Sequence, residues 1–152
     1  MYNVTLIPGD GIGPEVANAT KAVVDATGIQ INWEEVNAGE AVYEKVGTLV
    51  PDEVYASIEK NRLALKGPIT TPIGKGFRSI NVMLRTKYDL YSNVRPSRNF
   101  KGIDTPFNNV NMTIFRENTE GLYIGEEKVV DNNTTEATKR ITRSGSLRIC
   151  RE

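Results

Sequence analysis

Residues 2–16 read YNVTLIPGDGIGPEV, and this stretch decides the fold. The stretch from Tyr2 to Ile7 predicts a β-strand, and the proline and glycines that follow it predict a tight turn. Pro14 suits the first position of a helix, because proline lacks the amide hydrogen that this position leaves unpaired. The stretch therefore predicts a strand, a turn and a helix in succession, which is the opening of an α/β protein.

Helices and strands continue to alternate as far as residue 98. Such alternation predicts a largely parallel sheet covered by helices on both faces. In the helix expected from Pro51, Val54 and Ile58 are predicted to face inward. The expected elements are a helix from Pro14 to Thr27 with Val16, Thr20 and Val23 on one stripe, a strand through Ile29, Ile31 and Trp33, helices at 40–46 and from Pro51, a strand at 63–66, a helix at 79–86, and a strand at 89–95 that stops at Pro96.

The chain changes character after residue 98 and becomes rich in predicted β-structure. We therefore predict two parts, with residues 1–98 as the N-terminal part of a large α/β domain and residues 99–152 as the start of a smaller subdomain that contains β-strands. The expected elements of the second part are a strand with Val110, Met112 and Ile114 at alternate positions, a strand at 123–130, a loop at 131–135, and a strand end followed by the first turns of a helix at 142–152.

Charge and composition exclude several classes of partner. Lysine plus arginine and aspartate plus glutamate each total 19, so no net field attracts nucleic acid or an anionic membrane. No apolar run approaches the length of a membrane span. The first residues lack the basic start and apolar run of a signal peptide, so a cytoplasmic location is expected.

The chain contains no histidine, and Cys150 is its only cysteine. Serine-histidine and cysteine-histidine nucleophilic mechanisms, histidine-ligated metals and an intrachain disulfide are therefore excluded within the chain. The chemistry that remains belongs to carboxylate, tyrosine, lysine and arginine side chains.

The glycines of the first turn invite comparison with a dinucleotide-binding loop. The required G-x-G-x-x-G spacing is absent, because Pro14 directly follows Gly13, and no Lys-Ser or Lys-Thr pair completes a P-loop. A sharp turn by itself favours glycine. We interpret these glycines as turn residues and place no cofactor there.

Residues 78–95 read RSINVMLRTKYDLYSNVR and gather groups that suit an anion. Ser79 and Asn81 stand at the start of an expected helix, where free amides attract anions, and Arg85 lies further along it. Arg95 follows at the end of the next strand. Guanidinium groups bind carboxylates and phosphates through paired hydrogen bonds, so a polycarboxylate and a phosphate both remain open as ligands.

Arg116 ends the strand that contains Ile114, and Tyr123 follows it shortly afterwards. We expect this pair to bring another cation and a phenol to the same cleft. A tyrosine beside cations can donate a proton to a reacting group.

Three further segments, together with residues 78–95, resemble the isocitrate/isopropylmalate dehydrogenase family. They are LIPGDGIGPEV at 6–16, GPITTPIG at 67–74 and FRENTEGLY at 115–123. The resemblance spans the whole chain but only about the first half of a family member. The serine and asparagine at 79 and 81 look like the isocitrate branch, in which they meet the distal carboxylate of the substrate, so isocitrate ranks first and homoisocitrate second.

The resemblance implies oxidative decarboxylation of isocitrate to 2-oxoglutarate with reduction of NAD or NADP. The implied roles are substrate binding by Ser79, Asn81, Arg85, Arg95 and Arg116, protonation of the enolate by Tyr123, and contact with the nicotinamide by Thr71 and Asn81. Mg²⁺ or Mn²⁺ would stabilise the enolate. The metal-binding aspartates and a lysine that partners the tyrosine belong to the family's second half, so no metal ligand is assigned within this chain.

In such enzymes part of the site comes from a second subunit, so the resemblance implies a homodimer or a partner chain and predicts that this chain alone does not turn over. Two other readings stay open. The chain is either a non-catalytic short relative that binds a tricarboxylate or pairs with a partner, or a generic α/β protein whose arginines are solvated. The last reading requires every motif match to be a coincidence.

Overall fold

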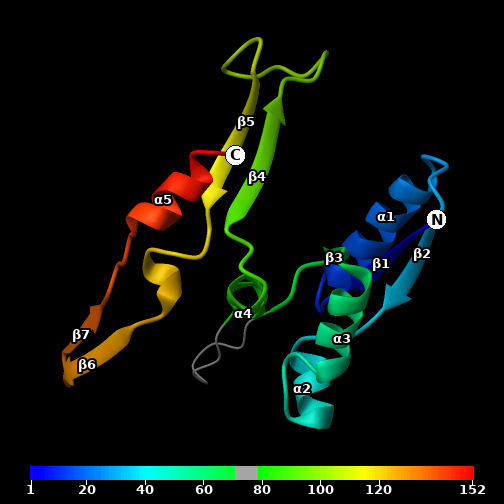
Figure 1. Cartoon of the computed structure of the whole chain (residues 1–152). Helices are drawn as coiled ribbons and strands as arrows, with labels where there is room; N and C mark the ends of the chain where they lie inside the picture. Colours follow the sequence, from blue (N-terminus) through cyan, green and yellow to red (C-terminus); the bar gives the residue numbers. More distant parts are fainter. Residues whose placement is uncertain (71–78) are drawn as a thin grey trace. The chain divides into compact units, whose positions relative to one another are not determined.

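The computed structural model of the protein describes residues 1–70 and 79–152 (Figure 1). Contacts divide the chain into two compact units, Met1–Ile80 and Asn81–Glu152. This division falls earlier than the predicted boundary at residue 98, because the strand that ends there pairs with a later strand of the second unit. The domain boundary of the whole family fold stays a prediction.

The first unit contains a parallel sheet in the order β2-β1-β3. β1 (Tyr2–Ile7) lies at its centre, between β2 (Ile31–Glu35) and β3 (Ala64–Lys66), with Thr5 opposite Ala64. From its third residue onward every residue of β1 is buried. A central parallel strand is covered on both faces, which agrees with the burial of Thr5 beside Val4, Leu6 and Ile7. The predicted α/β fold with a parallel sheet is confirmed.

The first unit also contains the three helices that the sequence predicts. They are α1 (Gly13–Asp25), α2 (Glu40–Val46) and α3 (Asp52–Asn61). α3 packs against β1, where the hydroxyl oxygens of Thr5 and Ser57 form a buried hydrogen bond of 2.8 Å. This bond satisfies two polar groups that would otherwise be costly to bury.

The prediction for the buried faces of these helices is partly wrong. In α1, Val16 and Val23 are 44% and 70% exposed, whereas Gly13 and Ala17 are buried. Residues four apart lie on one face of a helix, and this face must approach the backbone closely. Small residues therefore occupy it, and the β-branched residues of the predicted stripe point away. In α3, Val54 is fully buried as expected.

Three glycines hold the turn between β1 and α1 against the segment that follows β3. A Cβ atom would lie 1.9 Å from the Pro68 carbonyl oxygen at Gly9, and 2.1 Å and 2.5 Å from the Pro8 carbonyl oxygen at Gly67 and Gly13. No real side chain fits such distances, so glycine is needed for two backbones to touch. This agrees with the interpretation of Gly9 and Gly13 as turn residues.

Replacing Gly67 with alanine is expected to lower the free energy of unfolding by about 3 kcal/mol or more, because the added methyl group collides with backbone that cannot rotate away. Gly28→Ala is the control, since it has φ +81° but nothing within 4 Å of the new Cβ. Backbone strain alone costs about 1–2 kcal/mol there. Urea unfolding of both variants checks the prediction, and equal losses would contradict it.

Asp10 ties the same turn to two other segments. Its carboxylate accepts hydrogen bonds from the Thr70 amide at 2.6 Å and from the Glu40 amide, at the start of α2, at 3.2 Å. Partial burial favours the neutral acid, but these hydrogen bonds and the charge of Lys66 outweigh it and lower the pKa of Asp10. The folded protein therefore prefers the ionised carboxylate.

A lowered folded-state pKa means that the unfolded chain binds a proton first as the pH falls. The stability that the Asp10 carboxylate contributes is therefore complete above the unfolded value of about 3.9 and is lost as the pH falls through the lower folded value. We expect Asp10→Asn to destabilise the protein at about pH 7 and to differ less from the wild type at about pH 3. Urea unfolding at both pH values measures the difference, and a constant gap would refute the assignment.

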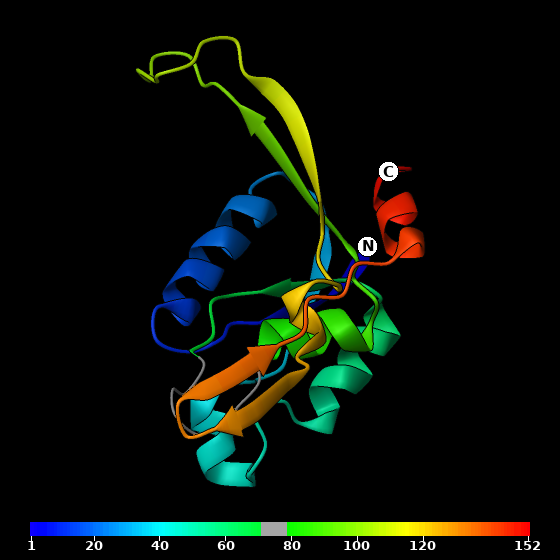
Figure 2. The same ribbon diagram turned by 90° about the vertical axis from the view of Figure 1, so that its left-hand side faces the viewer.

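The second unit contains most of α4 (Ile80–Lys87), which matches the expected helix, and an antiparallel ribbon of β4 (Ser92–Arg98) and β5 (Asn111–Glu117) (Figure 2). The prediction that β4 stops at Pro96 is wrong. Pro96 lies within the strand, opposite Thr113. Because the ribbon has two strands, proline's missing amide hydrogen removes no bond to a third strand.

Both faces of the β4–β5 ribbon are open along β5, where the first six residues are all exposed. Met112 and Ile114 do alternate along the strand as predicted, yet they are 54% and 48% exposed. The alternation indicated a strand correctly but not a buried face, because nothing in this unit covers the ribbon on that side.

A short 3-10 helix, η1 (Leu122–Ile124), replaces the first half of the strand predicted at 123–130. Gly121 and Gly125 flank it with φ of 75° and 68°. Left-handed residues on either side break an extended chain, and glycine adopts that conformation without strain. The strand prediction missed this helical turn.

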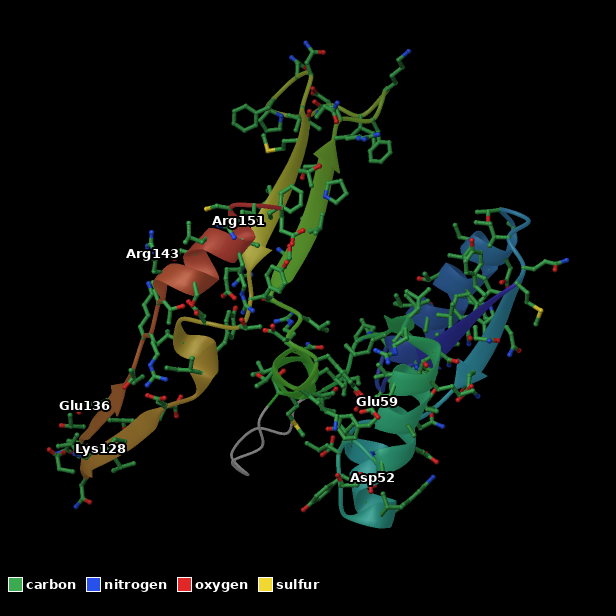
Figure 3. The ribbon with its side chains drawn as sticks, in the orientation of Figure 1. Asp52, Glu59, Lys128, Glu136, Arg143 and Arg151 are labelled. Atoms are coloured by element: carbon green, nitrogen blue, oxygen red, sulfur yellow. The ribbon has the colours of Figure 1, made fainter. Side chains whose placement is uncertain are left out.

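β6 (Glu127–Asp131) and β7 (Thr134–Ala137) form an antiparallel hairpin, with Lys128 opposite Glu136 (Figure 3). The loop predicted at 131–135 is therefore too long, since both its ends belong to strands. An opposite-charge pair across two strands favours this register modestly.

α5 (Arg143–Ile149) confirms the helix expected near the end of the sequence. Its N-cap is Thr142, whose hydroxyl accepts a hydrogen bond of 3.0 Å from the Gly145 amide. Within residues 1–70 and 79–152, every helix is too short or too polar to cross a membrane.

Candidate anion-binding site

Arg116 and Tyr123 are brought together as the sequence predicts. Nη2 of Arg116 donates a hydrogen bond of 2.5 Å to the Tyr123 hydroxyl oxygen, and the guanidinium carbon lies 5.7 Å from the centroid of the ring. Because the hydroxyl oxygen accepts this bond, its own hydrogen remains available to a ligand. The pair therefore offers a cation and a proton donor side by side.

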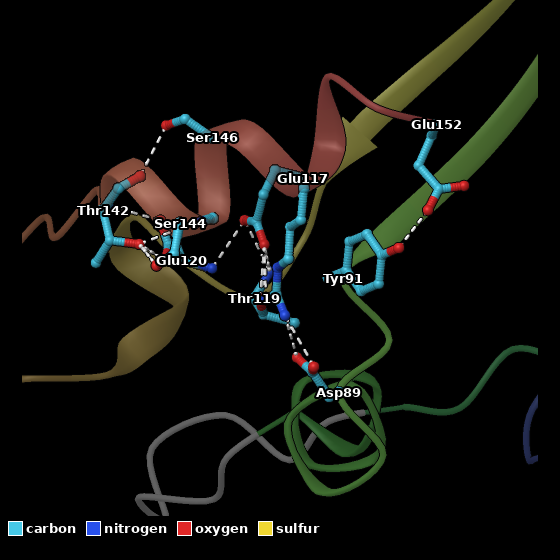
Figure 4. Close-up of polar contacts among 11 residues, drawn as sticks. Asp89, Tyr91, Glu117, Thr119, Glu120, Thr142, Ser144, Ser146 and Glu152 are labelled. Carbon is cyan, nitrogen blue, oxygen red and sulfur yellow. Dashed lines mark hydrogen bonds and ion pairs between the residues drawn. The ribbon is translucent and has the colours of Figure 1, made fainter.

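Arg116 and Tyr123 are joined by a turn at residues 117–120, and Figure 4 shows the side chains of Glu117, Thr119 and Glu120 in this turn. The Glu117 carboxylate accepts hydrogen bonds from the amides of Thr119, at 3.0 and 3.1 Å, and of Glu120, at 2.8 Å. Burial opposes the ionised form of Glu117, but these bonds prevail and lower its pKa. A carboxylate thus organises the turn that builds the arginine–tyrosine pair.

Glu120 fixes the other end of this turn to α5. Its carboxylate accepts hydrogen bonds from the amide of Thr142 at 2.9 Å and from its hydroxyl at 2.5 Å. Gly145 lies next to this carboxylate, because a Cβ atom at Gly145 would come within 2.3 Å of a Glu120 oxygen. The start of α5 is therefore built around the Glu120 carboxylate.

The strand register places Arg95 and Arg116 on the same face of the β4–β5 ribbon. Arg95 lies opposite Ile114, and Arg116 lies opposite Asn93. Side chains alternate between faces, so the two arginines are diagonal neighbours, about 7–8 Å apart at their Cα atoms. Both are exposed. Two guanidinium groups at this spacing suit an anion with more than one carboxylate.

Asn93 is a member of this face that the sequence reasoning missed. Its Oδ1 accepts a hydrogen bond of 3.0 Å from Nε of Arg95, which leaves both terminal nitrogens of that arginine for a ligand. The signal was present, because Asn93 stands two positions before Arg95 and must share its face in a strand.

The remaining predicted residues lie at or before α4. Ser79 directly precedes the helix, and Asn81 and Arg85 are four residues apart on one side of it. Arg85 belongs to the last turn. Thr71 lies outside the described residues. The structure thus brings Arg116 and Tyr123 into contact. Arg95 lies on the same ribbon face as Arg116, and Asn81 lies on the same side of α4 as Arg85.

A metal site is not found within the described ranges. No group of three or more histidine, cysteine, aspartate or glutamate side chains there is arranged to hold a metal ion.

Comparison with known proteins adds a family match. The family model for isocitrate/isopropylmalate dehydrogenase matches residues 3–152. The chain is 44% identical over 150 residues to the mitochondrial isocitrate dehydrogenase [NAD] subunit 2 of Kluyveromyces lactis, covering 99% of this chain and 40% of that protein. It is 45% identical over 149 residues to the mitochondrial isocitrate dehydrogenase [NAD] subunit alpha of Macaca fascicularis, covering 98% and 43%. The chain spans about two fifths of the length of these relatives.

Solved structures share the fold. Isocitrate dehydrogenase from Methylococcus capsulatus matches with a TM-score of 0.91 and 49% identity, over 99% of this chain and 46% of that one. A β-decarboxylating dehydrogenase from Thermococcus kodakarensis, in its apo form, matches with a TM-score of 0.76 and 36% identity, over 99% and 44%.

Proposed function

Because this chain belongs to the isocitrate/isopropylmalate dehydrogenase family, we propose that it is the substrate-binding part of an enzyme that oxidises and decarboxylates isocitrate. Family members are decarboxylating dehydrogenases. The observation that carries the proposal is the pairing of Arg116 with Tyr123, on the ribbon face that also carries Arg95. Cations and a proton donor are what a reaction through a carboxylate-bearing enolate requires.

In this proposal the arginines hold the carboxylates of the substrate. Arg95 and Arg116 receive carboxylate groups on the ribbon face, and Arg85 receives another from α4. Ser79 and Asn81 meet the distal carboxylate, which is the reason for placing isocitrate before homoisocitrate. Fixing three charged groups at once aligns the hydroxyl-bearing carbon for loss of hydride and lowers the entropic part of the barrier.

Tyr123 acts after decarboxylation. The hydroxyl-bearing carbon loses a hydride and its hydroxyl group loses a proton to solvent, which gives a β-keto acid. Loss of carbon dioxide from this acid leaves an enolate of 2-oxoglutarate. The Tyr123 hydroxyl donates its proton to the enolate carbon, while the Arg116 guanidinium bound to the same oxygen stabilises the negative charge that the proton leaves behind. A bound nicotinamide dinucleotide would accept the hydride, and a divalent metal ion would stabilise the enolate oxygen.

We place the dinucleotide away from the β1–α1 turn, because Gly9 and Gly13 are packed against the carbonyl groups of Pro68 and Pro8. Thr71 is our candidate for contact with the nicotinamide, with Asn81 near both ligands. NAD is preferred over NADP, since the relatives carry NAD in their names. We assign the metal-binding aspartates and the lysine that partners Tyr123 to the part of the relatives that this chain does not span.

The relatives are named as subunits, which supports a homodimer or a pairing with another chain. We propose a cytoplasmic location, although these relatives are named as mitochondrial proteins.

The test joins this chain to the part of the Methylococcus capsulatus enzyme that follows its matching segment; we call this protein the chimera. We expect the chimera to reduce NAD in the presence of isocitrate and Mg²⁺, and the chain alone to give no turnover. An inactive, folded chimera beside a chain that binds isocitrate would favour the non-catalytic relative instead. Turnover by the chain alone would refute the assignment of essential groups to the remainder of the fold.

A further inference from the structure

Arg148, on α5, contacts Asp89, Thr119 and Glu117, three residues of the second unit that Figure 4 labels. Its Nη1 donates to both carboxylate oxygens of Asp89, at 2.8 and 3.0 Å, and its Nη2 donates to the Thr119 hydroxyl at 2.7 Å. The guanidinium carbon lies 4.4 Å from the centroid of the Tyr91 ring, and a Glu117 oxygen lies 3.6 Å from Nη2. One side chain therefore connects three segments.

These segments are the ones that present the candidate anion-binding groups. Asp89 follows the helix that carries Arg85, at φ 46°, a left-handed conformation that fixes the exit of the chain from α4. Glu117 and Thr119 belong to the turn that brings Tyr123 to Arg116. Arg148 thus spans from the end of α4 to the end of β5.

This connection joins two segments that carry arginines of the candidate site. Arg85 and Arg116 carry like charges, which repel each other. The carboxylates of Asp89 and Glu117 lie on the same two segments, and the guanidinium between them attracts both. The planar guanidinium of Arg148 can hold both carboxylates, because its two terminal nitrogens donate to different partners in fixed directions.

We propose that Arg148 is a positioning residue, which holds the segment carrying Arg85 at a fixed distance from the segment carrying Arg116 and Tyr123. The inference rests on the proposed function, because it assumes that these groups bind one tricarboxylate. Arg148 does not touch the ligand; it sets the spacing at which the ligand is bound.

The first test measures the dissociation constant of isocitrate for the chain by NMR titration. Arg148→Ala is expected to weaken binding about tenfold or more, and Arg148→Lys similarly, because one ammonium group cannot serve Asp89 and Thr119 together. Arg140→Ala is the matched control, since Arg140 is paired with Glu126 at 2.7 Å on the surface of the same unit, and we expect a change of less than about twofold. Urea unfolding confirms that each variant is folded.

A second readout does not depend on isocitrate. A nitroxide on Cys150, the only cysteine and exposed, broadens the amide signals of nearby residues. In the wild type and in Arg140→Ala, we expect strong broadening of both Asp89 and Thr119. In Arg148→Ala the Asp89 signal should recover while the Thr119 signal stays broad, because α5 also packs against β5.

The outcomes separate the two claims. If the wild type fails to bind isocitrate, the proposed function falls, yet the nitroxide experiment still decides whether Arg148 holds α4. If Asp89 stays broadened in a folded Arg148→Ala variant, Arg148 does not hold that segment and the inference is overturned. It is equally overturned if the broadening is lost but the dissociation constant does not change. Should Arg148→Ala be unfolded, Asp89→Asn, which removes the same ion pair, replaces it in both measurements.

Discussion

Tyr123→Phe is expected to lower the turnover number of the chimera by about 10²–10⁴-fold, while the KM for isocitrate changes little. The phenylalanine keeps the ring beside the Arg116 guanidinium but removes the hydroxyl that accepts its hydrogen bond and donates the proton. Decarboxylation still leaves an enolate, which must then wait for a proton from water. The measurement is the initial rate of NADH formation at saturating isocitrate.

Tyr2→Phe is the control for this experiment, because Tyr2, the first residue of β1, is 63% exposed and lies outside the candidate site. We expect it to leave the rate unchanged. A Tyr123→Phe chimera that keeps a full turnover number would remove Tyr123 from the chemistry, whatever its place beside Arg116.

Arg116→Leu is expected to raise the KM for isocitrate by about 10–150-fold, since a hydrogen bond to a charged group is worth about 1.5–3 kcal/mol. The turnover number should fall as well, because the Tyr123 oxygen loses its cationic partner. Isocitrate titration of NADH formation by the chimera separates the two effects.

The matched control lies on the same ribbon. Arg98 stands opposite Asn111, and by alternation its side chain projects from the face opposite to Arg116. We expect Arg98→Leu to change the KM by less than about twofold. Equal effects of Arg98→Leu and Arg116→Leu would show that general charge, and not the ribbon face, attracts the substrate.

Sequence patterns predicted the first unit well because its elements are decided locally. The strand, turn and helix of residues 2–16 follow from the strand pattern of residues 2–7, the glycines and Pro14, and the structure has them in that order. The inner face of α1 could not be read in the same way. The inner face of α1 is decided by the close approach of Gly13 to the carbonyl oxygens of Pro8 and Pro68. This approach is a tertiary contact, which the periodicity of the helix sequence does not reveal.

The second unit was predicted less accurately because its strands have few neighbours. A two-stranded ribbon tolerates Pro96 in mid-strand and leaves Met112 and Ile114 exposed, so the rules for sheet interiors do not apply. The two flanking glycines of η1 signalled a break in the strand, but not the helical turn between them.

The candidate site shows the same limit. The arginines and Tyr123 were recognisable from their motifs, and Asn93 could have been found from strand alternation. Arg148 and Asp89 are far apart in the sequence and become partners only in the folded unit. No local pattern indicates such a pair, which is why the proposed binding residues could be predicted from the sequence and Arg148 could not.

The most direct test of the account is an isocitrate titration of the purified chain, observed through the Nε–Hε NMR signals of its arginines. We predict that the signals of Arg85, Arg95 and Arg116 shift with one common dissociation constant and continue to do so at about 0.15 M salt, while those of Arg98 and Arg140 stay in place. Shifts of similar size in every arginine that disappear with salt, or no shifts at all, would contradict the central claim that these three arginines form one site.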